Sequence, residues 1–260
     1  MLLKDVKNFL NTLKNYPPGL SILDNFDGLP SGEITEIVGV SGSGKTMFLH
    51  QLSVANFLDG DLNKFVLYLD SDFTFDSNKV KKLVEYFGLT ENILKNILIY
   101  QPTDLSSFKK ALKSVNLKQV KLIIIDSINN ILHEDVIDEP PEDEYRVLKK
   151  IFEFGNFLRK IVLNFPHIAI SLANQVRYSP IKLDKRFEAE NKFYGGWSGN
   201  YWIDEGYAPS LGSYWEEFID NRILLKNIRG GLKAIYIDFS STWPETMETI
   251  KLVNGVIFKY

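Results

Sequence analysis

One stretch of eight residues, 39–46, constrains the fold more than any other part of the sequence. It reads Gly-Val-Ser-Gly-Ser-Gly-Lys-Thr and fits the pattern G-x-x-x-x-G-K-[ST] at every fixed position. The preceding residues, 33–38, are typical of a strand, and apolar residues with helical spacing follow the loop from Met47 to Leu58. Strand, glycine-rich loop and helix in this order predict a phosphate-binding loop. A glycine- and serine-rich surface loop with an incidental lysine is the alternative, and the register of the flanking elements disfavours it.

The residue types of this loop suit a nucleoside triphosphate, ATP or GTP. Glycines let backbone N–H groups converge on the phosphates, and the helix N-terminus adds partial positive charge. Lys45 can reach the outer phosphates, and the Thr46 hydroxyl can ligate Mg²⁺. We therefore expect the nucleotide to be bound by Gly39, Val40, Ser41, Gly42, Ser43, Gly44, Lys45 and Thr46.

The composition excludes several other classes of protein. A net charge of −3 excludes a globally basic nucleic-acid binder, so any such contact needs a local patch. The chain has no cysteine, which rules out disulfides and thiolate metal sites, and its three scattered histidines disfavour a zinc centre. No apolar run approaches the roughly 20 residues of a membrane span, and the early charges at the N-terminus do not fit a signal peptide. We expect a soluble intracellular protein without a membrane partner.

After the loop, strand and helix patterns alternate along the chain. The segment 120–126 is almost continuously apolar, which is typical of a parallel strand buried on both faces. This alternation predicts an α/β fold, a twisted and mostly parallel sheet with helices on both faces. The expected strands are 33–38, 64–70, 97–100, 120–126 and 167–172, and the expected helices are 47–58, 80–87, 105–115 and 143–164.

The two ends of the chain differ from this alternating core. Residues 1–15 have an apolar stripe that predicts a short amphipathic helix, so we divide the chain into an arm, 1–19, and a core, 20–260. Residues 177–210 show no period. Turn signals at 230–231 and 254–255 separate predicted strands near 221–226, 232–239 and 254–260, which indicates a C-terminal antiparallel extension of the sheet.

A second set of polar groups lies at predicted strand ends, where nucleotides bind in such sheets. Asp126 follows four apolar residues and could ligate Mg²⁺, although buried strands often end in aspartate. Asp70 and Asp72 could orient or deprotonate an attacking water, or could cap the following turn. Gln175 could sense the outermost phosphate, or could simply be a polar strand end.

The order of these motifs resembles the eukaryotic and archaeal branch of the RecA/RadA recombinase superfamily. The resemblance rests on 28–37, on Tyr-Leu-Asp-Ser-Asp-Phe-Thr-Phe at 68–75, on Ile-Asp-Ser at 125–127 and on Ala-Asn-Gln-Val at 173–176. Pro-Ser-Leu-Gly at 209–212, with Tyr214-Trp215 and 221–225, is closest to the recombinase paralogues, the mediator type. The resemblance covers about residues 20–260 and implies a RecA-like P-loop ATPase core.

The resemblance also implies roles for single residues. Asp72 aligns with the position of the family's catalytic glutamate. Asp126 aligns with the aspartate that ligates Mg²⁺ in the family, and Gln175 aligns with the glutamine that senses the γ-phosphate. Aspartate is one methylene shorter than glutamate and places its oxygen about 1.5 Å further from the water. A misplacement of this size can cost about 10²-fold in rate. We therefore expect ATP and Mg²⁺ as cofactors, with hydrolysis that is slow or negligible.

The two DNA-contacting loops of the family match segments of unequal character. The first, roughly 130–145, contains seven carboxylates between His133 and Glu144, which repel phosphates and suit either a solvated loop or a basic partner. The second carries aromatic residues that could stack bases, offset by five acidic ones. We expect weak contact with single-stranded DNA at most. The basic residues available for it are Arg177, Lys182, Lys185, Arg186 and Lys192.

Together these features predict an ATP-binding recombinase paralogue that supports homologous-recombination DNA repair in a hetero-oligomer with other recombinase-family subunits. The resemblance implies a nuclear location in a eukaryote and a cytoplasmic one otherwise. The first alternative is a filament-forming, DNA-dependent ATPase recombinase. The second is a P-loop small-molecule kinase, for which 177–192 would have to serve as the lid; a transporter ATPase is disfavoured because its Leu-Ser-Gly-Gly-Gln signature is missing.

Overall fold

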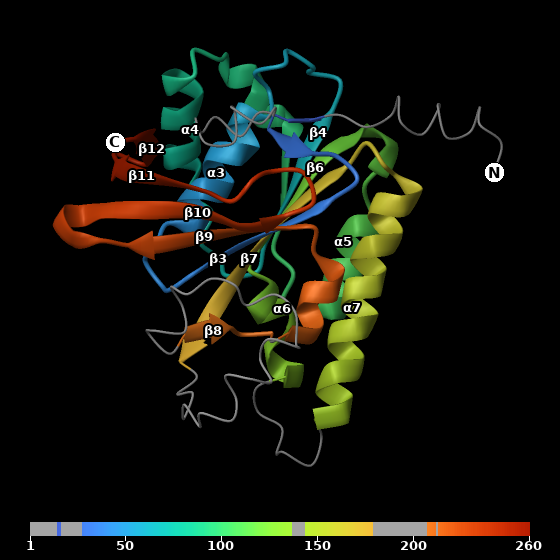
Figure 1. Cartoon of the computed structure of the whole chain (residues 1–260). Coiled ribbons are helices and arrows are strands. Elements are labelled where there is room, and N and C mark those ends of the chain that lie inside the picture. The colour runs from blue at the N-terminus through green and yellow to red at the C-terminus, as the bar shows by residue number, and fades with distance from the viewer. Residues whose placement is uncertain (1–14, 17–27, 137–143, 179–206, 212) are drawn as a thin grey trace.

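A mixed sheet runs through the centre of the molecule (Figure 1). The structure is a computed structural model, and it describes residues 15–16, 28–136, 144–178, 207–211 and 213–260. The strand order is β12-β11-β10-β9-β3-β7-β6-β4-β5, and the six strands from β9 to β5 are parallel. This confirms the predicted fold class. In spatial order the parallel strands are β9 (Asn221–Asn227), β3 (Ile34–Gly39), β7 (Ala169–Tyr178), β6 (Val120–Asp126), β4 (Phe65–Asp70) and β5 (Ile97–Tyr100).

Helices cover both faces of this sheet, as Figure 1 shows. Every residue of β6 is buried, because apolar side chains project from a central parallel strand into a core on each side. One core lies under α3 (Lys45–Ala55) and α4 (Ser77–Tyr86). The other lies under α5 (Leu105–Lys113), α6 (Ile128–Val136) and α7 (Glu144–Asn164).

Three antiparallel strands extend the sheet beyond β9; the antiparallel extension was predicted, but with two strands after 221–226 instead of three. They are β10 (Leu232–Ser240), β11 (Thr246–Val253) and β12 (Val256–Lys259). Strand β11 was not predicted, because its only buried residue is Ile250 and its apolar pattern is therefore weak. The predicted strand 254–260 is β12, which follows the turn at Asn254 and Gly255.

Two further predictions need correction. The segment 130–145 was expected to be a loop, but α6 continues to Val136, and α7 begins at Glu144. The segment 177–210 was expected to lack regular structure, but β7 continues to Tyr178 and pairs antiparallel with β8 (Tyr207–Pro209). Residues 137–143 and 179–206 lie outside the described part of the chain.

The predicted N-terminal helix at 1–15 lies outside the described residues, apart from its last position. That position is wrong, because Asn15 and Tyr16 form the short strand β1 (Asn15–Tyr16), which pairs with β2 (Leu29–Pro30). The division into 1–19 and 20–260 stays a prediction. Among the helices that the structure describes, none combines the length and apolar character that crossing a bilayer requires.

Candidate nucleotide-binding site

The phosphate loop joins β3 to α3 in a conformation that needs its glycines. Gly42 has φ of 75° and Gly44 has φ of 108°, values that side-chain-bearing residues rarely adopt. Within the loop, the Ser43 N–H donates to the Val40 carbonyl at 3.1 Å. A Cβ atom on Gly39 would lie 2.4 Å from Ser43 Oγ and 2.5 Å from the Leu225 carbonyl oxygen, so this position has no room for a side chain. Sequence and tertiary packing thus fix the loop together.

Lys45 lies across the loop that carries it. Its Nζ donates to the carbonyl oxygens of Gly39, at 2.7 Å, and Val40, at 3.1 Å. Burial lowers the pKa of this lysine, while Asp126 and Asp72 act in the opposite direction. An ammonium group so placed gains from any anion that enters the loop, because the anion compensates the charge that burial leaves poorly solvated.

Asp126, at the end of β6, lies next to the start of α3. Its carboxylate is 1% exposed, and burial raises its pKa to about 6. The Tyr68 hydroxyl donates to Asp126 Oδ2 at 2.9 Å, and the Thr46 side chain also hydrogen-bonds to Asp126; both favour the ionised form. A carboxylate and a hydroxyl in contact are hard oxygen donors of the type that Mg²⁺ prefers. Thr46 and Asp126 therefore fit a magnesium ion that phosphate oxygens also ligate.

Asp70 and Asp72 turn out to have different surroundings. Asp70 is fully buried and accepts hydrogen bonds from the backbone N–H groups of Thr74, at 2.9 Å, and Phe75, at 3.1 Å. It therefore caps the turn after β4. Asp72 lines the cavity beside the phosphate loop, and its Oδ1 accepts from the Ser127 N–H at 3.1 Å and from Ser127 Oγ at 2.9 Å.

Gln175 reaches the same cavity from β7, and neighbouring side chains hold its backbone. Its N–H donates to Asn129 Oδ1 at 2.7 Å, and its carbonyl accepts from the Ser210 N–H at 2.9 Å. Asn129 Nδ2 in turn donates to Ser210 Oγ, which donates to Asn174 Oδ1 at 2.7 Å. Asn129 and Ser210 were not predicted as site residues, because nothing in the local pattern shows that α6 and the chain after β8 meet here.

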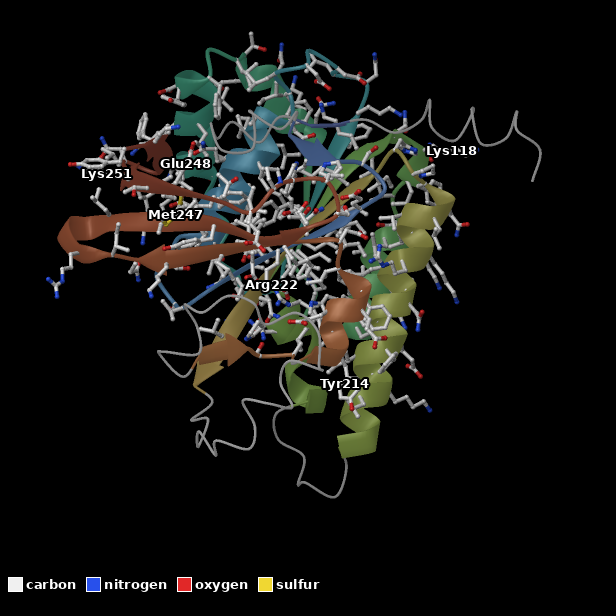
Figure 2. The ribbon with its side chains drawn as sticks, viewed as in Figure 1. Lys118, Tyr214, Arg222, Met247, Glu248 and Lys251 are labelled. Carbon is white, nitrogen blue, oxygen red and sulfur yellow. The ribbon has the colours of Figure 1, made fainter. Side chains whose placement is uncertain are left out.

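This polar junction continues into a buried charge cluster beneath it. Asn174 Nδ2 donates to Glu36 Oε1 at 2.7 Å, and Glu36 Oε2 accepts from Arg222 Nε at 2.6 Å. Arg222 also donates to Glu216 at 2.6 Å, and the Trp215 indole N–H donates to Glu36 at 2.8 Å. Both Glu36 and Arg222 are essentially inaccessible, and Figure 2 shows Arg222 inside the molecule beside the sheet. A buried pair with these hydrogen bonds fixes β3 against β9.

The predicted groups meet in one cavity of about 340 Å³. Its wall combines the loop, the acidic end of the sheet and two apolar residues that were not predicted to belong to the site, Met47 and Leu252. Gly39, Val40 and Ser43 belong to the loop but do not line the cavity. The lining residues are Ser41, Gly42, Gly44, Lys45, Thr46, Met47, Asp72, Thr74, Asp126, Gln175 and Leu252.

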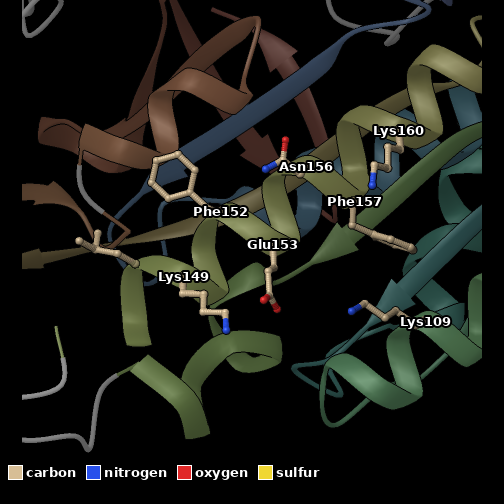
Figure 3. Close-up of a pocket in the computed structure, with 8 residues that line it drawn as sticks. Lys109, Lys149, Phe152, Glu153, Asn156, Phe157 and Lys160 are labelled. Atoms are coloured by element: carbon tan, nitrogen blue, oxygen red, sulfur yellow. The ribbon is translucent and has the colours of Figure 1, made fainter. Parts of the chain in front are cut away.

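A larger surface cavity, of about 790 Å³, lies between α5 and α7 and shares no lining residue with the first (Figure 3). Lysine and phenylalanine side chains dominate its wall. In the described part of the chain, no group of three or more His, Asp or Glu side chains could hold a metal ion by itself.

The residues proposed for DNA contact cannot be placed in the same way. The backbone of Arg177 lies in β7, where it pairs with Ala208. Lys182, Lys185, Arg186 and Lys192 lie outside the described residues. Of the acidic run from His133 to Glu144, the first four residues belong to α6 and the last one begins α7.

Comparisons with known proteins agree with this geometry. The family model described as Rad51 matches residues 19–197. The chain is 26% identical to "DNA repair protein RAD51 homolog 2" of Arabidopsis thaliana over 84% of this chain and 61% of that protein. It is 26% identical to "DNA repair protein rhp57" of Schizosaccharomyces pombe, over 76% of this chain and 64% of that protein.

The chain thus spans less than two thirds of the length of these two relatives. "DNA repair and recombination protein RadA" of Aeropyrum pernix is 29% identical over 93% of this chain and 72% of its own length. A solved structure described as the RadB recombinase shares the fold, with a TM-score of 0.65 at 19% identity over 94% of this chain and 99% of that one. Since the family model covers well over half of the sequence, the chain belongs to the Rad51 family, as its motifs indicated.

Proposed function

We propose that the chain is an ATP-binding recombinase paralogue that assists homologous-recombination DNA repair within a hetero-oligomer. Several of its relatives carry names of DNA repair proteins, among them RAD51 homolog 2 and rhp57. We also propose that ATP and Mg²⁺ are its cofactors and that its partner subunits belong to the same family. In a eukaryotic cell its site of action would be the nucleus.

One observation carries the nucleotide-binding part of this proposal. Four segments far apart in the sequence converge on the same cavity: the phosphate loop, the chain after β4, the end of β6 and β7. Each brings a group with a distinct use toward a triphosphate: Lys45, Asp72, Asp126 and Gln175. A cavity formed for an uncharged metabolite would not need a half-buried ammonium group near two carboxylates.

Binding follows from the chemistry of these groups. The N–H groups at the start of α3 and the Lys45 ammonium would hold the phosphates. Thr46 and Asp126 would hold Mg²⁺ together with phosphate oxygens, and the ion would neutralise part of the phosphate charge. Gln175, an exposed residue that lines the same cavity, would contact the outermost phosphate, so that ATP and ADP leave its side chain in different surroundings.

Hydrolysis would be slow because of how Asp72 is held. Its Oδ1 is engaged by both the N–H and the hydroxyl of Ser127, which ties the short side chain to the end of β6. A general base must come within hydrogen-bond reach of the water that it activates. Bound ATP would then act as an assembly clamp between subunits, and direct contact with single-stranded DNA would be weak.

The experiment that tests the proposal compares the wild type with Lys45→Ala, using Lys251→Ala on the exposed face of β11 as a matched control. We expect Lys45→Ala to weaken MgATP binding at least tenfold in calorimetric titration, since a charge-assisted contact to phosphate is lost. Its melting temperature should stay close to that of the wild type. Unchanged nucleotide affinity in Lys45→Ala would contradict the assignment of the loop.

The proposed association with partner subunits has to be tested with material from the native cell. Affinity purification with and without ATP should recover recombinase-family subunits in an ATP-dependent manner, and less of them with Lys45→Ala. Strong ATP turnover by the isolated chain, stimulated by single-stranded DNA, would favour a working recombinase instead. Phosphate transfer to a metabolite would favour a small-molecule kinase.

A further inference from the structure

Lys233, at the start of β10, reaches the phosphate loop from outside the cavity. Its Nζ donates to the Gly42 carbonyl at 2.7 Å, across 191 positions of sequence, and to Asn227 Oδ1 at 2.6 Å. In the sheet, Lys233 pairs with Asn227 of β9 and with Ile250 of β11, so its backbone is fixed from both sides. This lysine belongs to none of the motifs that the sequence contains.

The contact falls on the part of the loop with the most demanding conformation. The same lysine side chain covers Gly44, because its Cδ and Cε would lie 3.6 and 3.7 Å from a Cβ atom at that position. Gly42 and Gly44 both have positive φ, and Gly44 is the N-cap of α3 without a side-chain cap. One side chain therefore lies against both positions of the loop where only glycine fits well.

The geometry also fixes the peptide group between Gly42 and Ser43 at both ends. Its carbonyl accepts from Lys233, while its N–H donates to the Val40 carbonyl at 3.1 Å. A planar trans peptide held by both its oxygen and its hydrogen cannot rotate freely. The backbone N–H groups that follow, at the start of α3, are those that would meet the phosphates.

Other contacts join the same extension to α3. Gln51 exchanges two hydrogen bonds with the backbone of Ile257, at 2.9 and 3.3 Å, and Leu252 lines the nucleotide cavity. The antiparallel extension is therefore a support for the phosphate loop and its helix as well as an addition to the sheet. Lys233 is its only charged side chain that the described contacts place on the loop itself.

We propose that Lys233 is a positioning residue for nucleotide binding, which holds the phosphate loop in its binding conformation from outside the cavity. The inference rests on the proposed nucleotide-binding function and adds the antiparallel extension to the machinery of that site. Because the lysine acts through the loop and not on a particular phosphate, it should serve ATP and ADP equally.

The test is Lys233→Met, which keeps an apolar stem over Gly44 but removes the ammonium group. We expect the dissociation constants of MgATP and MgADP both to rise about tenfold, because a hydrogen bond from a charged donor to the loop is lost. Lys233→Arg should bind within about threefold of the wild type, since a charged donor is retained. The melting temperature should change by no more than about 2 °C, as for a half-exposed side chain.

Lys251→Met, on the neighbouring strand β11 and exposed (Figure 2), is the matched control and should bind both nucleotides like the wild type. Wild-type affinity in Lys233→Met would overturn the inference while leaving the proposed function intact. A loss confined to ATP would also overturn it, because it would indicate direct contact with the third phosphate. If the wild type binds neither nucleotide, the proposed function itself fails.

Discussion

The phosphate loop and the acidic end of the same cavity are built in different ways. The loop is eight consecutive residues, closed by its own hydrogen bonds and by Lys45. The acidic end is assembled from three strands: Asp72 is held by Ser127, 55 positions away, and Gln175 by Asn129, 46 positions away. The hydrogen bonds that close the loop are thus mostly local, with Lys233 of β10 and the Leu225 carbonyl of β9 as its distant supports, whereas every contact that holds the acidic end joins different elements. We expect hydrolysis to depend on more distant residues than binding does.

The largest effect should come from placing a side chain inside the loop end, with Gly39→Ala. The new Cβ would meet Ser43 Oγ at 2.4 Å and the Leu225 carbonyl oxygen at 2.5 Å, so the loop and β9 must separate. Overpacking of this kind costs about 3 kcal/mol of unfolding free energy, and nucleotide binding should fall below detection. Urea denaturation and calorimetric titration measure the two effects.

The matched control is Gly42→Ala, where a Cβ would find no atom within 4 Å and only the positive φ is unfavourable. It should cost about 1 kcal/mol of unfolding free energy. Equal losses in the two variants would show that the close approach of β9 does not shape the loop.

The second prediction concerns pH and the helix that carries the loop. His50 on α3 is fully buried beside Tyr68 and Phe75, and neither ring nitrogen has a hydrogen-bond partner among the described residues. Burial, together with Lys79, lowers its pKa from 6.5 to about 4, against the opposing charges of Asp76 and Asp70. The folded state therefore favours the neutral ring, and the unfolded state takes up a proton first as the pH falls.

His50 thus contributes stability above about pH 6.5 that is lost as the pH falls to about 4. His50→Phe should remove this loss, so its stability relative to the wild type should rise by about 3 kcal/mol between pH 7 and pH 4. Denaturation curves of both proteins at several pH values measure the difference, in which other titrating groups cancel. A pH-independent difference would contradict the assignment.

Asp126, at the acidic end of the cavity, should change the stability with pH in the direction opposite to that of His50. Burial raises the pKa of Asp126 to about 6, so the folded state favours its protonated form and stability is lost as the pH rises from about 4 through 6. His50 on the helix after the loop and Asp126 at the acidic end of the cavity therefore make the stability depend on pH in opposite directions. The contrast follows from chemistry, because burial disfavours the charged form of both an imidazole and a carboxylate.

The third prediction tests the sensitivity of hydrolysis. Asp72→Glu extends the carboxylate by one methylene beyond its contact with Ser127, and we expect ATP turnover to rise about tenfold. Phosphate release by purified protein measures it, with the Asp72→Glu/Lys45→Ala double variant as the background for contaminating activity. Turnover that does not change in Asp72→Glu would show that the length of this side chain does not limit the reaction.

The same difference between the two ends explains what the sequence could predict. The sequence could predict that Lys45, Thr46 and Asp126 lie together, because each belongs to a continuous motif whose geometry is local. Helix α6 was not predicted because most of it lies in the segment that was matched to a loop of the family. Strand β11 was not predicted because it has a single buried residue. The sequence could not assign Asp70 to turn capping and Asp72 to the cavity. Asp70 accepts from backbone N–H groups of the turn after β4, whereas Asp72 accepts from Ser127 at the end of β6, and this difference is visible only in the structure.

The smallest expected effect concerns the junction that the sequence did not reveal. Asn129 accepts from the Gln175 N–H and donates to Ser210, so it ties the proposed phosphate sensor to α6 and to the chain after β8. Asn129→Ala should leave ADP affinity unchanged and lower the preference for ATP over ADP about threefold, because the Gln175 backbone loses one of two anchors. Competition titration of the two nucleotides measures the ratio.

Ser210→Ala serves as the comparison variant, because it removes the hydroxyl and leaves both backbone bonds of Gln175 in place. Its ATP preference should stay close to that of the wild type. If Asn129→Ala keeps the full preference, the position of Gln175 is set by β7 alone, and the acidic end is less dependent on distant contacts than its construction indicates. If ADP affinity falls as well, the junction supports the loop end too, and the two ends of the cavity are mechanically one unit.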